Sequence, residues 1–346
     1  MTNFRESEIL KLLASGRVRR PGVVEGVDDQ DDCAVLALPA GRELCATTDF
    51  VRGTGFTLHK LGHLSFADLG RYVVVANVSD LAAMGATPIA YLSVVRYGPD
   101  RTLDEVSEML KGIDAACLEF DCPLVGGDSG SYGADVLSGT ALGLVPTGRR
   151  LSRNTMQEGD AVYVSGQIGG AAAALAAGLG DVAAREPAAF KSALTRWSQP
   201  QPRTHLGRAL VDLGFRVSAM DVSDGLTASL QQLTRITGLG FIIEAAKLPI
   251  SEDVRSIADA LGTATVHLAC SASVDFELLV GCPPQRETAL LEAANAAETP
   301  LTRIGTCVGG GAISMTKASG GPYEEMPGAP WDHQTHDVAR MFDARP

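Results

Sequence analysis

Strand-like and helix-like stretches alternate along the whole chain, and this alternation restricts the fold more than any other feature of the sequence. Apolar runs bounded by turn residues predict strands at 33–38, 43–48, 89–97, 122–125, 136–146, 160–165, 240–244, 274–280 and 301–308. Apolar residues at helical spacing predict helices at 65–84, 102–117, 205–213, 226–236, 251–261 and 285–297. Glu105, three residues after Thr102, completes a capping-box pattern at the start of the second of these helices. Strands and helices mixed in this way predict an α/β (α+β layered) architecture.

A polar, loop-like stretch at 149–159 divides these elements into two groups. The 346 residues are enough for two domains of ordinary size. We therefore expect an N-terminal domain at 1–148 and a C-terminal domain at 149–346.

Composition narrows the classes of partner. The net charge of −12 disfavours a nucleic-acid partner, because nucleic acids are polyanions. Seven cysteines without a C-x-x-C pair are typical of buried thiols in a reducing compartment, and the six histidines show no zinc-ligand spacing. The segment 1–13 predicts a short amphipathic helix instead of a signal peptide, and the most apolar run, 169–179, is too short to span a bilayer. We expect a cytoplasmic protein with neither a membrane nor a nucleic-acid partner.

The stretch 219–225 combines two carboxylates, Asp221 and Asp224, with Ser223 between them and Gly225 after them. The pattern predicts a strand end, a tight turn and the start of a helix. Helix N-termini attract anions, but carboxylates there would repel a phosphate unless a cation such as Mg²⁺ bridges them. The alternative is purely structural, with Ser223 capping the helix and Asp224 interacting favourably with its dipole.

Other aspartates follow or interrupt apolar stretches, namely Asp31 with Asp32, Asp49 after Thr47 and Thr48, Asp80, and Asp128. Each alone could be an ordinary solvated carboxylate. Asp80 differs because it interrupts the apolar helix predicted at 65–84 and has no basic residue one turn away. A carboxylate on a buried helix needs a partner, and a divalent cation can be that partner.

Two further features are consistent with a bound phosphate, each with a structural alternative. Gly126 and Gly127 suit either a backbone that approaches a ligand closely or an ordinary tight turn. Arg153 suits either a bidentate phosphate donor or a solvent-exposed arginine. No Walker A pattern or protein-kinase motif set is present, and the glycines at 166–170 lack the acidic partner of a dinucleotide-binding unit. The segments 77–80 and 221–224 share Val-Ser-Asp, which would be consistent with an internal duplication.

Six segments keep a characteristic order and spacing over nearly the whole chain. They are Asp-Asp-Cys-Ala-Val-Leu at 31–36, Thr-Thr-Asp at 47–49, Asn-Val-Ser-Asp-Leu-Ala-Ala-Met-Gly-Ala at 77–86, Gly-Gly-Asp at 126–128, Gly-Asp-Ala-Val-Tyr-Val-Ser-Gly at 159–166 and Ala-Met-Asp-Val-Ser-Asp-Gly-Leu at 219–226. This set resembles thiamine-monophosphate kinase. The family shares a fold of two α/β domains with aminoimidazole-ribonucleotide synthetase and selenophosphate synthetase.

The resemblance implies ATP-dependent phosphorylation of thiamine monophosphate to thiamine diphosphate. Transfer would be direct and in line, assisted by several Mg²⁺ ions, without a phosphoenzyme or a separate catalytic side chain. The N-terminal domain would bind ATP and metal and form a homodimer through its sheet, and acids of both halves would converge on one pocket. The implied metal ligands are Asp32, Thr47, Thr48, Asp49, Asp80, Asp128, Asp221 and Asp224. The implied ATP contacts are Gly127, Asp128, Arg153 and Ser223, and Trp331 would stack on the thiamine.

Departures from the family pattern fall mainly on the substrate side. Gln30 replaces a glycine before the first acidic pair, Gly55 replaces a histidine that contacts substrate, and Val274 replaces a glutamate that does the same. A valine side chain cannot accept a hydrogen bond, so the acceptor pocket differs. Two alternatives therefore stay open. One is a related ATP-dependent kinase or synthetase with a different small phosphorylated acceptor, and the other is a nucleotide-binding homologue without catalysis.

Overall fold

The computed structural model describes residues 23–25, 35–36, 38–51, 56–317, 320–322 and 326–328. The chain forms two compact units. The first comprises Met1–Leu81 and Ala86–Arg150, and the second comprises Ala82–Gly85 and Leu151–Pro346. Each unit has its own sheet and its own core, and each is described by itself below.

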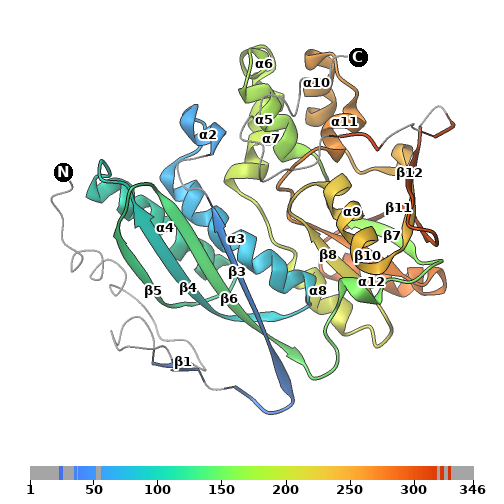
Figure 1. Ribbon diagram of the computed structural model, residues 1–346, viewed down its shortest axis with the longest axis horizontal. Helices are drawn as coiled ribbons and strands as arrows, with labels where there is room; N and C mark the ends of the chain where they lie inside the picture. The colour runs from blue at the N-terminus through green and yellow to red at the C-terminus, as the bar shows by residue number, and fades with distance from the viewer. Residues whose placement is uncertain are drawn as a thin grey trace. The chain divides into compact units, whose positions relative to one another are not determined.

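The first unit is built on a four-stranded sheet with the order β3-β6-β4-β5 (Figure 1). These strands are β3 (Arg42–Val51), β4 (Thr87–Tyr97), β5 (Leu124–Ser131) and β6 (Val136–Pro146). Only the β4–β5 pair is parallel. Two short strands, β1 (Val23–Glu25) and β2 (Val35–Leu36), form a separate antiparallel pair.

Helices α3 (Phe66–Ala83) and α4 (Leu103–Glu119) lie on one side of this sheet, after the short helix α2 (Thr57–Lys60) (Figure 1). We call the side facing α3 the inner face. Tyr91 of β4 is fully buried there, and its hydroxyl donates to the Val73 carbonyl of α3 at 3.2 Å. Side chains alternate between the two faces of a strand, so β6 buries every second residue, including Leu137, Ala141 and Val145.

The opposite side of the sheet, the outer face, carries large apolar side chains. Leu44 and Phe50 of β3 are 48% and 59% exposed, and Val94 of β4 is 36% exposed. Isolated apolar residues on a surface are ordinary, but three on one sheet face form a feature that a function has to explain.

The second unit is built on a six-stranded sheet with the order β12-β9-β11-β7-β10-β8. Its strands are β7 (Ala161–Ser165), β8 (Ser218–Val222), β9 (Gly240–Glu244), β10 (Glu277–Cys282), β11 (Leu301–Val308) and β12 (Ile313–Thr316). All neighbouring strands are antiparallel except β12 and β9. Strands β7 and β8 both flank β10 in antiparallel register, so the C-terminal ends of β7 and β8 lie beside the start of β10.

The helices of the second unit are α5 (Gly170–Gly178), α6 (Val182–Arg185), α7 (Pro187–Ser198), α8 (Thr204–Val211), α9 (Leu226–Thr237), α10 (Glu252–Leu261), α11 (Thr265–Cys270) and α12 (Glu287–Ala296), with short 3₁₀ turns η2 (Arg153–Thr155), η3 (Ala245–Lys247) and η4 (Pro284–Arg286). Helix α9 buries Leu226, Leu230 and Leu233 against β7 and β9 residues such as Val164 and Phe241. The helical spacing of those leucines explains why this segment folds as an amphipathic helix.

The layered α/β architecture with two domains is confirmed. Strands 136–146, 240–244 and 301–308 have the predicted bounds, and the capping box that Thr102 forms with Glu105 is present at the start of α4. The chain divides after Arg150, and no described helix is long and apolar enough to cross a membrane. The six described cysteines are free, and all but Cys45 are buried.

Other expectations were wrong or incomplete. Strand β10 begins at Glu277, three residues later than predicted, and β5 continues through Gly126, Gly127 and Asp128 to Ser131. Helices α7 and α11 and strand β12 were not predicted, because their apolar patterns are short. The helix predicted at 1–13 lies outside the described residues. Of the strand predicted at 33–38, Val35 and Leu36 form β2, and residues 33, 34 and 37 lie outside the described residues.

Candidate functional site

On the inner face of the first sheet, β3 and α3 bring three of the predicted ligands into one region. The Thr47 hydroxyl donates to Asp80 Oδ2 at 2.5 Å. Asp49 lies two residues after Thr47 on the same strand, and strand alternation therefore directs both to the same face. Asp80 is partly exposed although the helix around it is buried. We expected the Asp80 carboxylate to need a partner, and the Thr47 hydroxyl is one such partner.

The charge of Asp49 also acts on Tyr91, which is buried on the inner face. Burial raises the pKa of the Tyr91 phenol well above its usual value, and Cys117, Cys122 and the charge of Asp49 add to the effect. The Asp49 carboxylate also accepts a 2.6 Å hydrogen bond from the Phe50 backbone N–H. The sequence had indicated that Asp49 follows the end of its strand. In the structure Asp49 lies inside β3.

The outer face carries the other predicted residues of this sheet. Thr48 donates to the Gly139 carbonyl at 2.7 Å. Asp128 pairs in register with Val94, whose side chain is on the outer face, and its carboxylate forms an ion pair with Arg96. Three interstrand steps separate β5 from β3, so the Asp128 backbone is roughly 14 Å from β3. Within one chain the structure therefore does not bring Asp128 together with Thr47 and Asp80.

A glycine at position 127 is needed for a structural reason that neither sequence interpretation anticipated. It lies inside β5 opposite Ser93 of β4, so the tight-turn interpretation is wrong. A Cβ atom on Gly127 would lie 2.0 Å from the Ser93 carbonyl oxygen. Close pairing of β4 and β5 therefore requires a glycine here, whatever the residue contributes to a ligand.

In the second unit, 218–226 folds as predicted, as a strand, a turn and a helix start. Asp221 is buried within β8, whereas Ser223 and Asp224 are partly exposed in the turn. The N-cap of α9 is Gly225, with φ of 89° and no side-chain capping bond, so the interpretation of Ser223 as the cap is wrong. A Cβ on Gly225 would lie 2.1 Å from the Ser271 carbonyl oxygen. The turn is thus packed tightly against the loop that precedes β10.

That loop, 271–276, carries the predicted substrate position Val274. Val274 is its only partly exposed residue, and the other five are buried. Asp275 accepts a 2.9 Å hydrogen bond from the Gly169 backbone N–H, just before α5. Burial raises the pKa of Asp275 to about 6, and the bond from Gly169 opposes that rise. The exposed part of this loop is therefore the aliphatic side chain of Val274.

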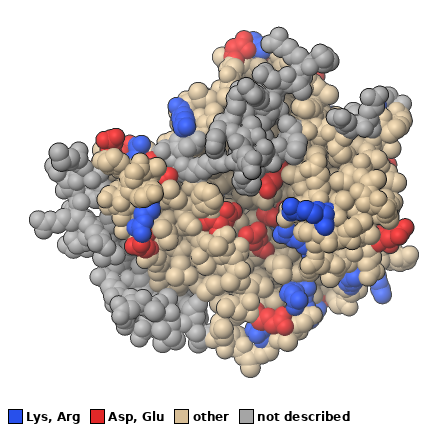
Figure 2. All heavy atoms as spheres, viewed as in Figure 1, with Lys and Arg blue, Asp and Glu red and all other residues tan. Residues whose placement is uncertain are grey.

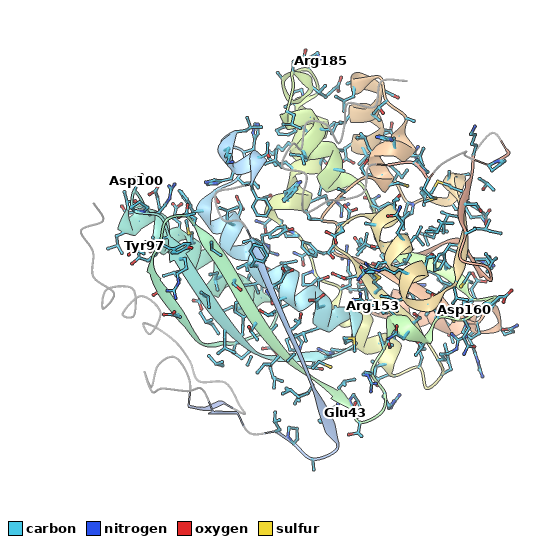
Figure 3. All side chains as sticks on the ribbon, in the orientation of Figure 1. Glu43, Tyr97, Asp100, Arg153, Asp160 and Arg185 are labelled. Carbon is cyan, nitrogen blue, oxygen red and sulfur yellow. The ribbon has the colours of Figure 1, made fainter. Side chains whose placement is uncertain are left out.

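Arg153 lies at the other end of β8. It opens η2, and its carbonyl accepts from the hydroxyl of Ser218, the first residue of β8 (Figure 3). Strand rise puts Ser218, at the start of β8, roughly 17 Å from Ser223 in the turn, so Arg153 and Ser223 would meet only through a long ligand or the arginine side chain.

Among the described residues, no group of three or more His, Cys, Asp or Glu side chains is arranged to hold a metal ion. The predicted positions Asp32, Gly55 and Trp331 lie outside the described residues. The side-chain donors in this region are hard oxygen atoms, namely the carboxylates of Asp49 and Asp80 and the Thr47 hydroxyl. This donor set suits Mg²⁺, which usually takes one or two carboxylates and completes its shell with water and phosphate oxygens.

Sequence reasoning missed two residues beside the turn, Arg203 and Glu277. Glu277 is fully buried and accepts from Arg203 Nε at 2.7 Å and from Nη2 at 2.5 Å. An acidic residue inside the apolar run 276–282 was the one available signal, because such a carboxylate needs a partner.

Charged side chains of both signs are spread over the face shown in Figure 2, and among the described residues on that face the lysine and arginine side chains form no continuous patch.

Comparison with protein families matches both units. The AIR synthase related protein N-terminal domain matches residues 30–145, and the corresponding C-terminal domain matches residues 157–317.

Individual relatives are similar over most of their length. The thiamine-monophosphate kinase of Synechococcus elongatus is 34% identical over 268 residues, which cover 76% of this chain and 79% of that protein. The crystal structure of thiamine-monophosphate kinase from Stenotrophomonas maltophilia K279a has a TM-score of 0.73 and 30% identity, covering 89% of this chain and 94% of that one. The structure of AaThiL complexed with AMPPCP and TMP has a TM-score of 0.71 and 23% identity, covering 86% and 89%. The last likeness concerns the fold alone.

Proposed function

The chain belongs to the thiamine-monophosphate kinase family of the AIR synthase related proteins, and we propose that it transfers the γ-phosphoryl group of ATP to the phosphate of thiamine monophosphate. The observation that carries this proposal is the similarity to named thiamine-monophosphate kinases at 30% identity or more over most of the chain. AaThiL, which shares the fold, is complexed with AMPPCP and TMP, and we propose the corresponding substrates, ATP and thiamine monophosphate, for this chain.

The proposed metal ligands come from both units, and in the first unit we assign only residues of the inner face. In the first unit we assign Thr47, Asp49 and Asp80, because strand alternation and the 2.5 Å Thr47–Asp80 hydrogen bond support a common location. In the second unit we assign Asp221 and Asp224. Mg²⁺ would neutralise charge on the transferring phosphoryl group, which is the main requirement of this reaction class.

The chain's own residues would contribute mainly orientation. The Thr47 hydroxyl donates to one oxygen of Asp80 and so helps to orient the carboxylate. The glycine N-cap of α9 leaves the start of that helix without a side-chain cap, next to Ser223. A helix start of this kind favours phosphate oxygens, so Ser223 and the α9 N-terminus are assigned to ATP. Arg153 and Gly127 keep their proposed ATP contacts.

We propose a homodimer that forms through the outer face of the first sheet. The exposed side chains of Leu44, Phe50 and Val94 support this face as the interface. Light scattering of the Phe50→Glu variant should report a monomer, with Leu118→Glu as the control at another exposed apolar position.

We propose a cytoplasmic location, supported by the free thiols. Burial raises the pKa of Cys282 and Cys307 to about 11, which keeps both as unreactive thiols.

A second candidate function keeps phosphoryl transfer but changes the acceptor, because Val274 is the partly exposed side chain of its loop. The acceptor would then present an apolar group, and not a hydrogen-bond donor, to this position. Val274→Glu tests the choice. If thiamine monophosphate is the acceptor in the family's usual pose, the variant should lower its KM; with a different acceptor, the variant should raise that acceptor's KM about tenfold or more.

The direct test is incubation of the purified protein with ATP, MgCl₂ and thiamine monophosphate, followed by chromatographic detection of thiamine diphosphate. The same assay with a panel of phosphorylated metabolites identifies any other acceptor. If ATP binds in a thermal-shift assay but no acceptor is phosphorylated at high enzyme concentration, the chain is a non-catalytic nucleotide-binding homologue and the proposal is wrong.

A further inference from the structure

Two arginine–carboxylate pairs join the opposite ends of the same three strands in the second unit. The first, which we call the loop-end pair, is Arg203–Glu277, beside the ends of β7 and β8 from which the loops to α5 and α9 leave. The second, the far-end pair, is Arg216–Asp160, just before β7 and β8 begin. Both carboxylates are nearly inaccessible, at 0% and 3% side-chain exposure, so both pairs are desolvated to a similar extent.

The loop-end pair is a closed hydrogen-bond network. Arg203 donates from Nε to Glu277 Oε2 at 2.7 Å and from Nη2 to Oε1 at 2.5 Å. The Ser165 hydroxyl donates to the same Oε2 at 2.5 Å and accepts from the Leu278 backbone N–H at 2.8 Å. Each oxygen of the buried carboxylate is therefore held in a defined place by the last residue of β7 and the residue that precedes α8.

This carboxylate is in contact with the start of the loop between β7 and α5. Gly166 follows Ser165 with φ of 53°, and a Cβ atom on it would lie 2.1 Å from Glu277 Oε1. The loop backbone thus lies directly on the Glu277 carboxylate, so a movement of that side chain would move the loop.

The same residue is linked to the turn between β8 and α9. Glu277 pairs in register with Val222, and the neighbouring Phe276 N–H donates to the Val222 carbonyl at 3.0 Å. Ser223 and Asp224 follow immediately. The loop-end pair therefore fixes the strand end that carries the turn, whereas the far-end pair does not reach it.

The energetics indicate that this pair provides geometry more than stability. Replacing a buried ion pair by apolar residues of similar volume is often neutral or stabilising, whereas the fork of an arginine on a carboxylate is strongly directional. A chain that needed stability alone at this position could use apolar side chains.

We propose that Arg203 and Glu277 are positioning residues that hold the loops 166–169 and 223–225 in the arrangement needed for phosphoryl transfer. The inference rests on the proposed function for its kinetic part, because Ser223 and Asp224 are assigned there to ATP and metal. The structural part, loop positioning, can be measured without any activity.

The experiment compares three variants of the full chain. Arg203→Lys keeps the charge but loses the fork. The double variant Arg203→Met/Glu277→Met removes both charges, and of their partners only the Ser165 hydroxyl loses its acceptor. Arg216→Lys makes the same change in the far-end pair and is the matched control. Each is measured by thermal unfolding, by amide hydrogen exchange and by steady-state kinetics.

We expect all three to remain folded. Exchange of amides in 166–169 and 223–225 should rise about tenfold or more in Arg203→Lys and in the double variant, and stay unchanged in Arg216→Lys. In the kinase assay, kcat should fall about 10- to 100-fold in the two loop-end variants, with KM for ATP changed less than about threefold. In the control, an effect on KM for ATP is expected instead, because Arg216 also donates to the Thr155 carbonyl at 2.8 Å, near Arg153.

Two results of the exchange measurement alone would overturn the inference. One is unchanged loop exchange in both loop-end variants, and the other is an equal increase in the control, which would mean that any buried pair of this sheet has the same role. If the wild-type protein phosphorylates no acceptor, the proposed function fails, but the exchange data still decide whether the pair positions the loops. If exchange rises and kcat does not change, the pair orders the loops without serving the reaction, and the inference is wrong.

Discussion

The segments 77–80 and 221–224 share Val-Ser-Asp, yet the two units use this pattern in different ways. In the first unit the pattern lies inside α3, and Asp80 is presented from a helix with its oxygen held by Thr47. In the second unit it begins in β8 and ends in the turn before α9, which presents Asp224. The same short pattern therefore delivers a carboxylate from a rigid helix in one case and from a turn in the other.

The flanking residues explain the difference. Leu81, Ala82 and Ala83 are strong helix formers, so α3 continues through the first pattern. Gly225 follows the second pattern with φ of 89°, a conformation that other residues avoid, and it stops the strand and starts the helix. The two segments are therefore not equivalent positions, and the shared pattern gives no support to an internal duplication.

The largest effect is expected from Gly225→Ala, which changes the turn between β8 and α9. The new Cβ would lie 2.1 Å from the Ser271 carbonyl in a strained conformation. The free energy of unfolding should fall by about 3 kcal/mol or more. Denaturant unfolding measures it, with Gly180→Ala as the control because no atom lies within 4 Å of a Cβ there. A loss of less than about 1 kcal/mol would mean that the turn is not rigid.

Asp80→Asn tests the carboxylate that helix α3 presents. The amide oxygen of Asn can still accept from Thr47, so the melting temperature should stay within about 3 °C of the wild type. The loss of a negative ligand should lower Mg²⁺-dependent turnover by about 100-fold or more. The exposed Asp104 of α4, changed to Asn, provides the control. Full activity of Asp80→Asn would exclude Asp80 as a metal ligand.

Two adjacent threonines of β3 test the hydrogen bond that holds Asp80 of helix α3. Thr47→Val removes a hydroxyl that donates to Asp80, and Thr48→Val removes one that donates to the Gly139 carbonyl. Both variants should lose about 1 kcal/mol of unfolding free energy. Only Thr47→Val should also lose turnover, by about tenfold, because Thr48 is on the outer face. Equal kinetic losses would contradict the assignment by face.

The smallest structural effect is expected from Ser223→Ala, which asks whether the turn depends on a serine cap. Since Gly225 is the N-cap of α9, the free energy of unfolding should change by less than about 0.5 kcal/mol. Thr102→Ala, which breaks the capping box of α4, should cost about 1 kcal/mol. A rise in KM for ATP in Ser223→Ala would support the proposed contact, whereas an equal loss of stability in the two variants would restore the cap interpretation.

The sequence by itself determined the features that depend on neighbouring residues. Periodicity over ten or more residues gave α3 and β6, and the Thr102–Glu105 spacing gave a helix start, because these signals arise from hydrogen bonds and packing within one element. The ordered segments also identified the family, since they extend over nearly the whole chain.

Only the tertiary structure decided which side chains meet. Asp128 and Asp80 looked alike as acids beside apolar stretches, but strand order and register put Asp128 on the outer face and three strands from β3. Arg203 and Glu277 are 74 residues apart and form the loop-end pair because β10 lies between β7 and β8. Sheet order and register depend on the burial of whole faces, and no local pattern of residues encodes that burial.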